Sequence, residues 1–173
     1  MNAPQNPAGE YVPADNLNPA RRTELIAEIA AVPSELRSLV ANLSQEQLAT
    51  KYRNWTIRQI VHHLADSHLN AYLRFKWTLT EETPTIKPYD ETNWSALPDA
   101  LGGDIAPPLA LLDATHARWL QLLGTMADAD FSRSYFHPEK GSTVSLNAAL
   151  ASYAWHGRHH LAQVKWILAS RVA

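Results

Sequence analysis

The chain of 173 residues contains no cysteine. This absence excludes disulfide bonds, thiolate metal ligands and a cysteine nucleophile. A metal ion in this protein would therefore have to be bound by histidine and carboxylate side chains.

The chain also lacks an excess of charge of either sign and any long apolar run. Its 15 basic and 17 acidic residues give a formal net charge of −2, without a block of like charges. This balance argues against nucleic acid and anionic membranes as partners. No eighteen apolar residues run together, and the start, MNAPQNPAGEYVPADNLNP, has neither the basic end nor the apolar stretch of a signal peptide. We therefore expect a cytoplasmic protein.

Length and composition predict a single folded domain after a short lead-in. Apolar residues make up 46% of the chain and charged residues 18%, which is typical of a globular protein. Residues 1–18 are rich in proline and show little apolar periodicity, so we expect them to be extended. Residues 19–173 are then expected to form the domain.

Two helix starts are marked by capping residues. Asn18 precedes Pro19, which predicts an N-cap and a helix that continues, with a kink or an end at Pro33, to about residue 43. Thr56 and Gln59 have the spacing of a capping box and predict a long helix that ends near residue 80.

Two further helices are predicted from apolar periodicity, over about 108–127 and 145–170. The long connection 81–107 is expected to be functional, mobile or locally helical, and 128–141 to form a turn or short hairpin. Four helices without a convincing strand pattern predict an all-α four-helix bundle with long inter-helix connections.

Histidine is concentrated in two of these helices. In WHGRHH, His156 and His160 are four residues apart and lie on one mostly apolar helix face, whereas His159 points about 100° away. In HHLADSH, both His63 and His68 are candidates to face them, and periodicity alone does not choose between the two. His62 has no assigned role.

A pair of histidines one turn apart and a third from a facing helix would supply three nitrogen ligands and leave a position open for water or substrate. The zincin motif is excluded because Gly157, not glutamate, follows His156. The alternative is a group of core histidines that are hydrogen-bonded to tyrosines or carboxylates.

The stretches WTIRQIVHHLADSHLNAYLRFKWTLTEETPTIKPYDETNW and YAWHGRHHLAQV closely resemble the YfiT-like branch of the DinB superfamily. Members of this branch carry a provisional description as metal-dependent hydrolases. The resemblance implies a four-helix bundle in which His63, His156 and His160 hold a divalent metal, zinc or nickel. It also implies a homodimer.

From this resemblance we expect a hydrolase that uses metal-activated water on a small-molecule substrate. Two alternatives stay open: a metal-dependent thiol S-transferase that uses bacillithiol or another low-molecular-weight thiol, and a non-catalytic metal-binding helical dimer. Asp66 and Asn70 follow His63 on the same helix and are candidates to support the ligands, although Asp66 could equally be a solvated surface residue. Arg74 could bind an anionic substrate, but the simpler expectation for it is a surface salt bridge.

Overall fold

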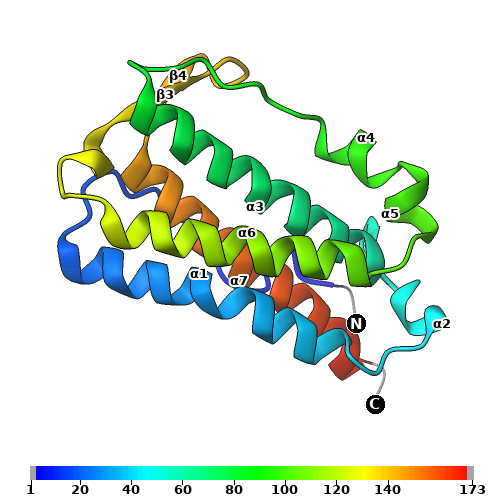
Figure 1. Ribbon diagram of the computed structural model, residues 1–173. Coiled ribbons are helices and arrows are strands. Elements are labelled where there is room, and N and C mark those ends of the chain that lie inside the picture. The colour runs from blue at the N-terminus through cyan, green and yellow to red at the C-terminus, as the bar shows by residue number, and fades with distance from the viewer. Residues whose placement is uncertain (1–2, 171–173) are drawn as a thin grey trace.

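The computed structural model describes residues 3–170, and four long helices dominate it (Figure 1). They are α1 (Pro19–Val40), α3 (Ile57–Thr80), α6 (Ala106–Thr125) and α7 (Leu146–Ser170). The all-α bundle predicted from the sequence is therefore confirmed. None of the described helices combines the length and the apolarity needed to cross a bilayer.

The order of the helices around the bundle differs from that of a simple up-and-down bundle. Helix α1 packs against α6 and α7, and α3 packs against the same two helices. The consecutive long helices α1 and α3 therefore lie at opposite corners. In Figure 1, α1 and α7 run in one direction while α3 and α6 run in the other. Two parallel neighbours require a connection that returns along the bundle, which explains the long segment between α3 and α6.

The predicted helix starts are confirmed. The Asn18 side chain accepts a hydrogen bond from the Arg21 amide, and Thr56 and Gln59 form the capping box of α3. Of the two outcomes predicted at Pro33, a kink or an end of the helix, the end is wrong, because α1 continues through Pro33 to Val40. Proline removes one backbone donor, and burial of Pro33 and its neighbours offsets this loss.

Short elements fill the connections. Between α1 and α3 lie α2 (Gln45–Leu48) and the strand pair β1 (Lys51–Tyr52) and β2 (Trp55–Thr56). The α3–α6 connection contains α4 (Glu91–Ser95) and α5 (Pro98–Gly102), which agrees with the expectation of local helical turns. Before α7, the turn η1 (Asp130–Ser132) leads into an antiparallel hairpin of β3 (Ser134–His137) and β4 (Ser142–Ser145).

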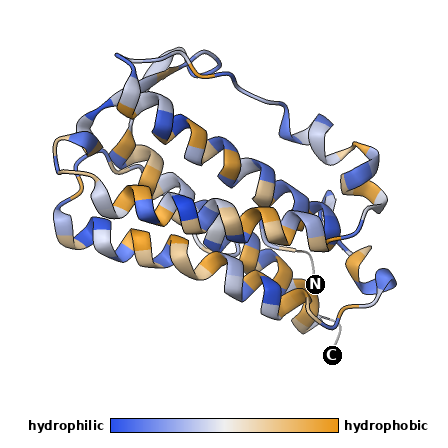
Figure 2. Ribbon diagram, in the orientation of Figure 1, coloured by the Kyte–Doolittle hydropathy of each residue, from blue (hydrophilic) through white to orange (hydrophobic). Residues whose placement is uncertain are grey.

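The core is divided into two apolar clusters. Figure 2 shows hydrophobic residues concentrated along the four long helices, while the α3–α6 connection and the hairpin are mostly hydrophilic. One cluster holds Ala71 and Phe75 of α3, and the other holds Ile60 and Leu64. Helices α6 and α7 likewise contribute one stretch to each cluster. Where the two stretches meet, each of the three helices carries a buried histidine or two: His68 on α3, His116 on α6, and His159 and His160 on α7. A layer of imidazoles therefore crosses the middle of the bundle.

Helices α1 and α7 approach closely beside this layer. A Cβ atom added at Gly157 would lie 2.6 Å from Cγ2 of Val32, which is inside any normal contact distance. Glycine at this position lets α7 pack tightly on α1, and this packing fixes the height of His156 and His160 in the bundle.

Candidate metal centre

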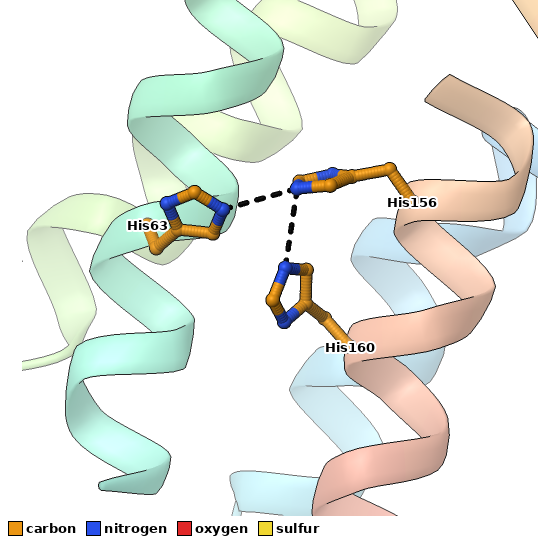
Figure 3. A group of neighbouring side chains, drawn as sticks. All are labelled: His63, His156 and His160. Atoms are coloured by element: carbon orange, nitrogen blue, oxygen red, sulfur yellow. Dashed lines mark hydrogen bonds between the residues drawn. The ribbon is translucent and has the colours of Figure 1, made fainter. Parts of the chain in front are cut away.

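Three histidines from two helices converge at the centre of the bundle. His63 extends from α3, and His156 and His160 extend from α7 on successive turns (Figure 3). Nε2 of His156 lies 3.0 Å from Nε2 of His63 and 3.1 Å from Nε2 of His160. One ring nitrogen from each residue lies within 4.8 Å of the other two. The structure thus brings together the three residues that the resemblance selects, and it places His63, not His68, in this group.

The three imidazoles are held in the neutral form. Burial lowers the pKa of His63, His156 and His160 well below the usual value, and the neighbouring rings of the cluster lower it further. A neutral imidazole has one nitrogen with a free lone pair, which is the form that binds metal ions. The cluster is therefore in its metal-binding form at neutral pH.

The outer nitrogen of His160 orients its lone pair toward the centre. Nδ1 of His160 lies 2.8 Å from Oε1 of Gln163, an oxygen that can only accept, so Nδ1 carries the proton. Nε2 of His160 then carries the lone pair. The amide nitrogen of Gln163 in turn lies 2.8 Å from Nε2 of His159, which places His159 beside the centre as an outer contact.

His156 is tied to a chain of buried histidines that crosses the bundle. Its Nδ1 lies 3.3 Å from Nε2 of His68, and Nδ1 of His68 lies 2.7 Å from Nε2 of His116 on α6. Burial lowers the pKa of His116 to about 4, and the Ile29 backbone beside the ring opposes this shift, although Nδ1 of His116 has no partner of full hydrogen-bond geometry. The Ile29 carbonyl is the acceptor that Pro33, four residues later, leaves free.

A carbonyl beside His116 favours a proton on Nδ1 of that ring. Nε2 of His116 then accepts from His68, and Nε2 of His68 accepts from Nδ1 of His156. This order leaves the lone pair of His156 on Nε2, facing the lone pair of His160. Facing lone pairs repel unless a cation lies between them. A tetrahedral ion with bonds of about 2.0–2.1 Å to nitrogen holds its ligands about 3.4 Å apart. The separations of 3.0 and 3.1 Å from Nε2 of His156 are near this value, so a small adjustment of the rings would admit such an ion.

The remaining sequence candidates lie outside the cluster. Asp66 is half-buried on α3, and its pKa is influenced by Asp99 of α5. The Asn70 side chain donates to the Asp66 carbonyl at 2.9 Å. Burial lowers the pKa of His62, and the Asp99 charge opposes this shift. A role for Asp66 or Asn70 in supporting the ligands stays a prediction, because neither side chain has a recorded contact with the three histidines within residues 3–170.

Replacing Asp66 with asparagine should stabilise the protein at neutral pH. Burial, reinforced by the Asp99 charge, raises the pKa of Asp66 from 3.8 to about 6. The folded state therefore binds this proton more tightly than the unfolded state, and ionisation of Asp66 lowers stability as the pH rises from about 4 to about 6. The gain in thermal midpoint for Asp66→Asn should be larger at about pH 7.5 than at about pH 4.5. An equal gain at both pH values, or the same pattern in the exposed control Glu46→Gln, would contradict this assignment.

A cavity of about 480 Å³ opens beside the cluster. The three histidines line this cavity together with Trp55. The centroid of the Trp55 ring lies 4.5 Å from that of His63 and 6.0 Å from that of His160, and the Trp55 ring is nearly parallel to His160. The other lining residues from the helices and the α3–α6 connection include Ser67, Arg74, Tyr89 and Tyr153. The expected surface salt bridge of Arg74 is wrong, because this side chain is buried and lines the cavity.

The comparisons with known proteins agree with this architecture. A profile of the DinB superfamily matches residues 28–164. The chain belongs to the DinB superfamily. It is 45% identical over 160 residues to a Bacillus subtilis protein named "Putative metal-dependent hydrolase YfiT", which covers 91% of this chain and 90% of that protein. It is also 44% identical over 166 residues to a Bacillus pumilus protein of the same description, covering 95% of this chain and 94% of the relative.

A solved structure of a DinB-superfamily relative shows the same fold. The structure of YfiT from Bacillus subtilis matches with a TM-score of 0.92 and 43% sequence identity, over 96% of both chains. It is described as "a probable metal-dependent hydrolase with an unusual four-helix bundle topology". The present protein also departs from a simple up-and-down bundle, because its consecutive long helices α1 and α3 lie at opposite corners.

Proposed function

We propose that this protein is a hydrolase that acts on a small molecule through a divalent metal, zinc or nickel, held by His63, His156 and His160. The observation that carries the proposal is the convergence of three neutral imidazole nitrogens at a cavity. The names of the relatives support the metal dependence and the class of reaction.

When bound, a divalent ion held by three neutral histidines would lower the pKa of a coordinated water to about 7 and would polarise a substrate carbonyl. The chain itself prepares the site in three ways. Gln163 and His68 fix the orientation of His160 and His156. Trp55 covers one side of the cluster and restricts the access of bulk water. Within residues 3–170 no carboxylate joins the three histidines, so at least one ligand position is left for water or substrate.

Elemental analysis of untagged protein tests the metal, and we expect about one zinc or nickel ion per chain. Removing the ion with a chelator should lower the thermal midpoint, and adding back zinc or nickel should restore it. Failure to bind either ion after incubation would contradict the proposal.

Activity then distinguishes the reaction classes. Ester and amide substrates should be cleaved by the metal-loaded protein and not by the chelated protein, without any added thiol. Turnover that requires a low-molecular-weight thiol would instead assign a thiol S-transferase. Stoichiometric metal without turnover of either substrate class would favour a metal-binding protein that is not an enzyme.

A further inference from the structure

Arg74 is a buried cation that has no counterion among the described residues. Its side chain is only 8% exposed and lines the same cavity as the three histidines. One terminal nitrogen, Nη1, lies 3.0 Å from the Tyr153 hydroxyl, while Nε is buried without a partner. Within residues 3–170 no carboxylate forms an ion pair with Arg74.

The neighbouring tyrosines do not neutralise this charge. Tyr135 and Tyr153 both lie close to Arg74, and burial is the largest influence on each and raises the pKa of each phenol. Both phenols are therefore uncharged at neutral pH. A buried charge without a partner is costly, so its presence requires an explanation beyond folding.

Several other arginines are paired with a carboxylate, whereas Arg58 is also buried with an unpartnered Nε but donates to the Gln45 side-chain oxygen and does not line this cavity. Arg21 pairs with Glu24, Arg22 with Asp128, Arg37 with Asp113, and Arg158 with Glu28. A larger hollow of about 790 Å³ between α1 and α7 has charged residues that are paired in this way, and it contains none of the three histidines. Arg74 also lines a neighbouring hollow of about 300 Å³, but the hollow of about 480 Å³ brings it together with the three-histidine cluster.

Further basic groups surround Arg74. His137 at the end of β3 is 8% exposed, its Nδ1 has no partner, and the positive charges of Arg74 and Lys140 lower its pKa after the larger effect of burial. Lys140 is exposed at the rim of the cavity, as are the carboxylates of Glu91 and Glu139. Arg74 therefore supplies the positive charge in the buried part of the cavity, beside an uncharged His137, whereas the acidic groups stay at the surface.

The free edge of the guanidinium matches an oxyanion. Nη1 donates to Tyr153, Tyr135 also lies within hydrogen-bond reach of the guanidinium, and Nε has no partner. Nε and the adjacent Nη2 form a planar fork that can bind two oxygens of one carboxylate or phosphate group. A lysine at this position would supply charge but no fork.

The same face of α3 connects this edge to the metal centre. His63 and Arg74 are eleven residues apart, which is three helical turns and about 16 Å between Cα positions. The arginine side chain can lean back toward the helix N-terminus and shorten the gap to roughly 10 Å. Ser67 lies between them on the cavity wall. A ligand that reaches both ends must therefore be elongated.

We propose that Arg74, with His137 and Lys140, binds an oxyanion group at one end of an elongated small substrate whose reacting bond lies at the three-histidine centre. This inference rests on the proposed function and narrows its substrate class to molecules with a carboxylate or phosphate several bonds from the reacting group.

Binding of oxyanions to the chelated, metal-free protein tests the inference separately from the metal. The probes are hexanoate and inorganic phosphate, titrated by calorimetry into the wild-type chain, Arg74→Gln, Arg74→Lys and the surface control Arg37→Gln. We expect the wild-type chain to bind at least one of the two probes, and Arg37→Gln to bind that probe with the same affinity. Arg74→Gln should bind that probe about 10–100-fold more weakly, because the charged hydrogen-bond donors are lost. The affinity of Arg74→Lys should lie between those of wild type and Arg74→Gln, because lysine keeps the charge but not the planar pair of donors.

A preference for hexanoate would assign a carboxylate and a preference for phosphate would assign a phosphate. Equal binding by Arg74→Gln, or no binding of either probe by wild type, would overturn the inference, whatever metal content the protein has. His137→Gln provides a second variant if Arg74→Gln does not fold, and it should weaken binding of the same probe severalfold. Arg74→Met should not lower the thermal midpoint, since it removes an unpaired buried charge; a large decrease would instead assign Arg74 a structural role.

Discussion

Replacing His156 with alanine is expected to abolish high-affinity metal binding. Nε2 of His156 lies within hydrogen-bond distance of Nε2 of both His63 and His160, so its removal takes away the central member of the group and leaves two ligands. Structural zinc sites with four ligands contribute about 10–16 kcal/mol, or about 3–4 kcal/mol per ligand, which corresponds to a loss of affinity on the order of 10²–10³-fold or more. Any metal-dependent turnover should be lost with the metal.

Thermal unfolding in the presence and absence of metal measures this effect without a known substrate. At a free metal concentration of about 100 times the dissociation constant, binding adds about 2.7 kcal/mol, which raises the midpoint of a chain of this size by roughly 5–10 °C. The midpoint of wild type should rise on addition of zinc or nickel, and that of His156→Ala should not.

His159→Ala is the matched control, because His159 lies on the same helix but is linked to the centre by a hydrogen bond to Gln163 and by edge-on packing against the His160 ring, 5.3 Å between centroids, and not as one of the three converging nitrogens. It should retain the metal-induced rise, with affinity within about tenfold of wild type. A metal-induced rise in His156→Ala equal to that of wild type would show that the ion binds elsewhere.

The bundle was predictable from the sequence because its helix starts depend on local chemistry. The Asn18 cap and the Thr56–Gln59 capping box satisfy backbone donors of their own helices, so they can be identified without tertiary information. Helix order was not predictable in the same way. Periodicity identifies an apolar face but not the neighbour that covers it, and here α3 packs on α6 and α7 rather than on α1.

The choice between His63 and His68 shows the limit of periodicity at the candidate site. Both side chains are buried on α3, and both contact His156, but through different nitrogens: His63 meets Nε2 and His68 meets Nδ1. A pattern of buried positions does not tell one ring nitrogen from the other. The resemblance to the DinB superfamily selected His63 because it carries information on the site as a whole.

Two residues were missed or misjudged for opposite reasons. His116 lies among the apolar residues Leu112 and Trp119 at helical spacing, and an imidazole on such a face is a signal that could have identified it. Arg74 gave the wrong signal, because a lysine or arginine near the end of a long helix usually reaches solvent. Its burial depends on the β3–β4 hairpin and the α3–α6 connection, whose positions periodicity does not supply.

Replacing His68 and His116 together with leucine is expected to weaken metal binding while the fold is retained. The two rings are buried and hydrogen-bonded to each other, so changing both leaves no orphaned partner between them and substitutes apolar volume in the core. Nδ1 of His156 loses its acceptor, and with it the interaction that holds the Nε2 lone pair toward the centre. Loss of such outer contacts lowers metal affinity by about 10–100-fold.

Competition with a chelator of known affinity measures this loss, and His62→Leu is its matched control. His62 is also buried on α3, but its Nε2 has no hydrogen-bond partner. Burial lowers its pKa and Asp99 opposes this shift, and none of the three ligand candidates contributes to it. The control should bind metal as wild type does, whereas the double variant should bind more weakly at an unchanged helical content. If the double variant and His62→Leu bound metal equally well, the hydrogen-bonded series of histidines from His156 to His116 would contribute to core packing alone. The orientation of the His156 ring would then have to come from the bound ion itself.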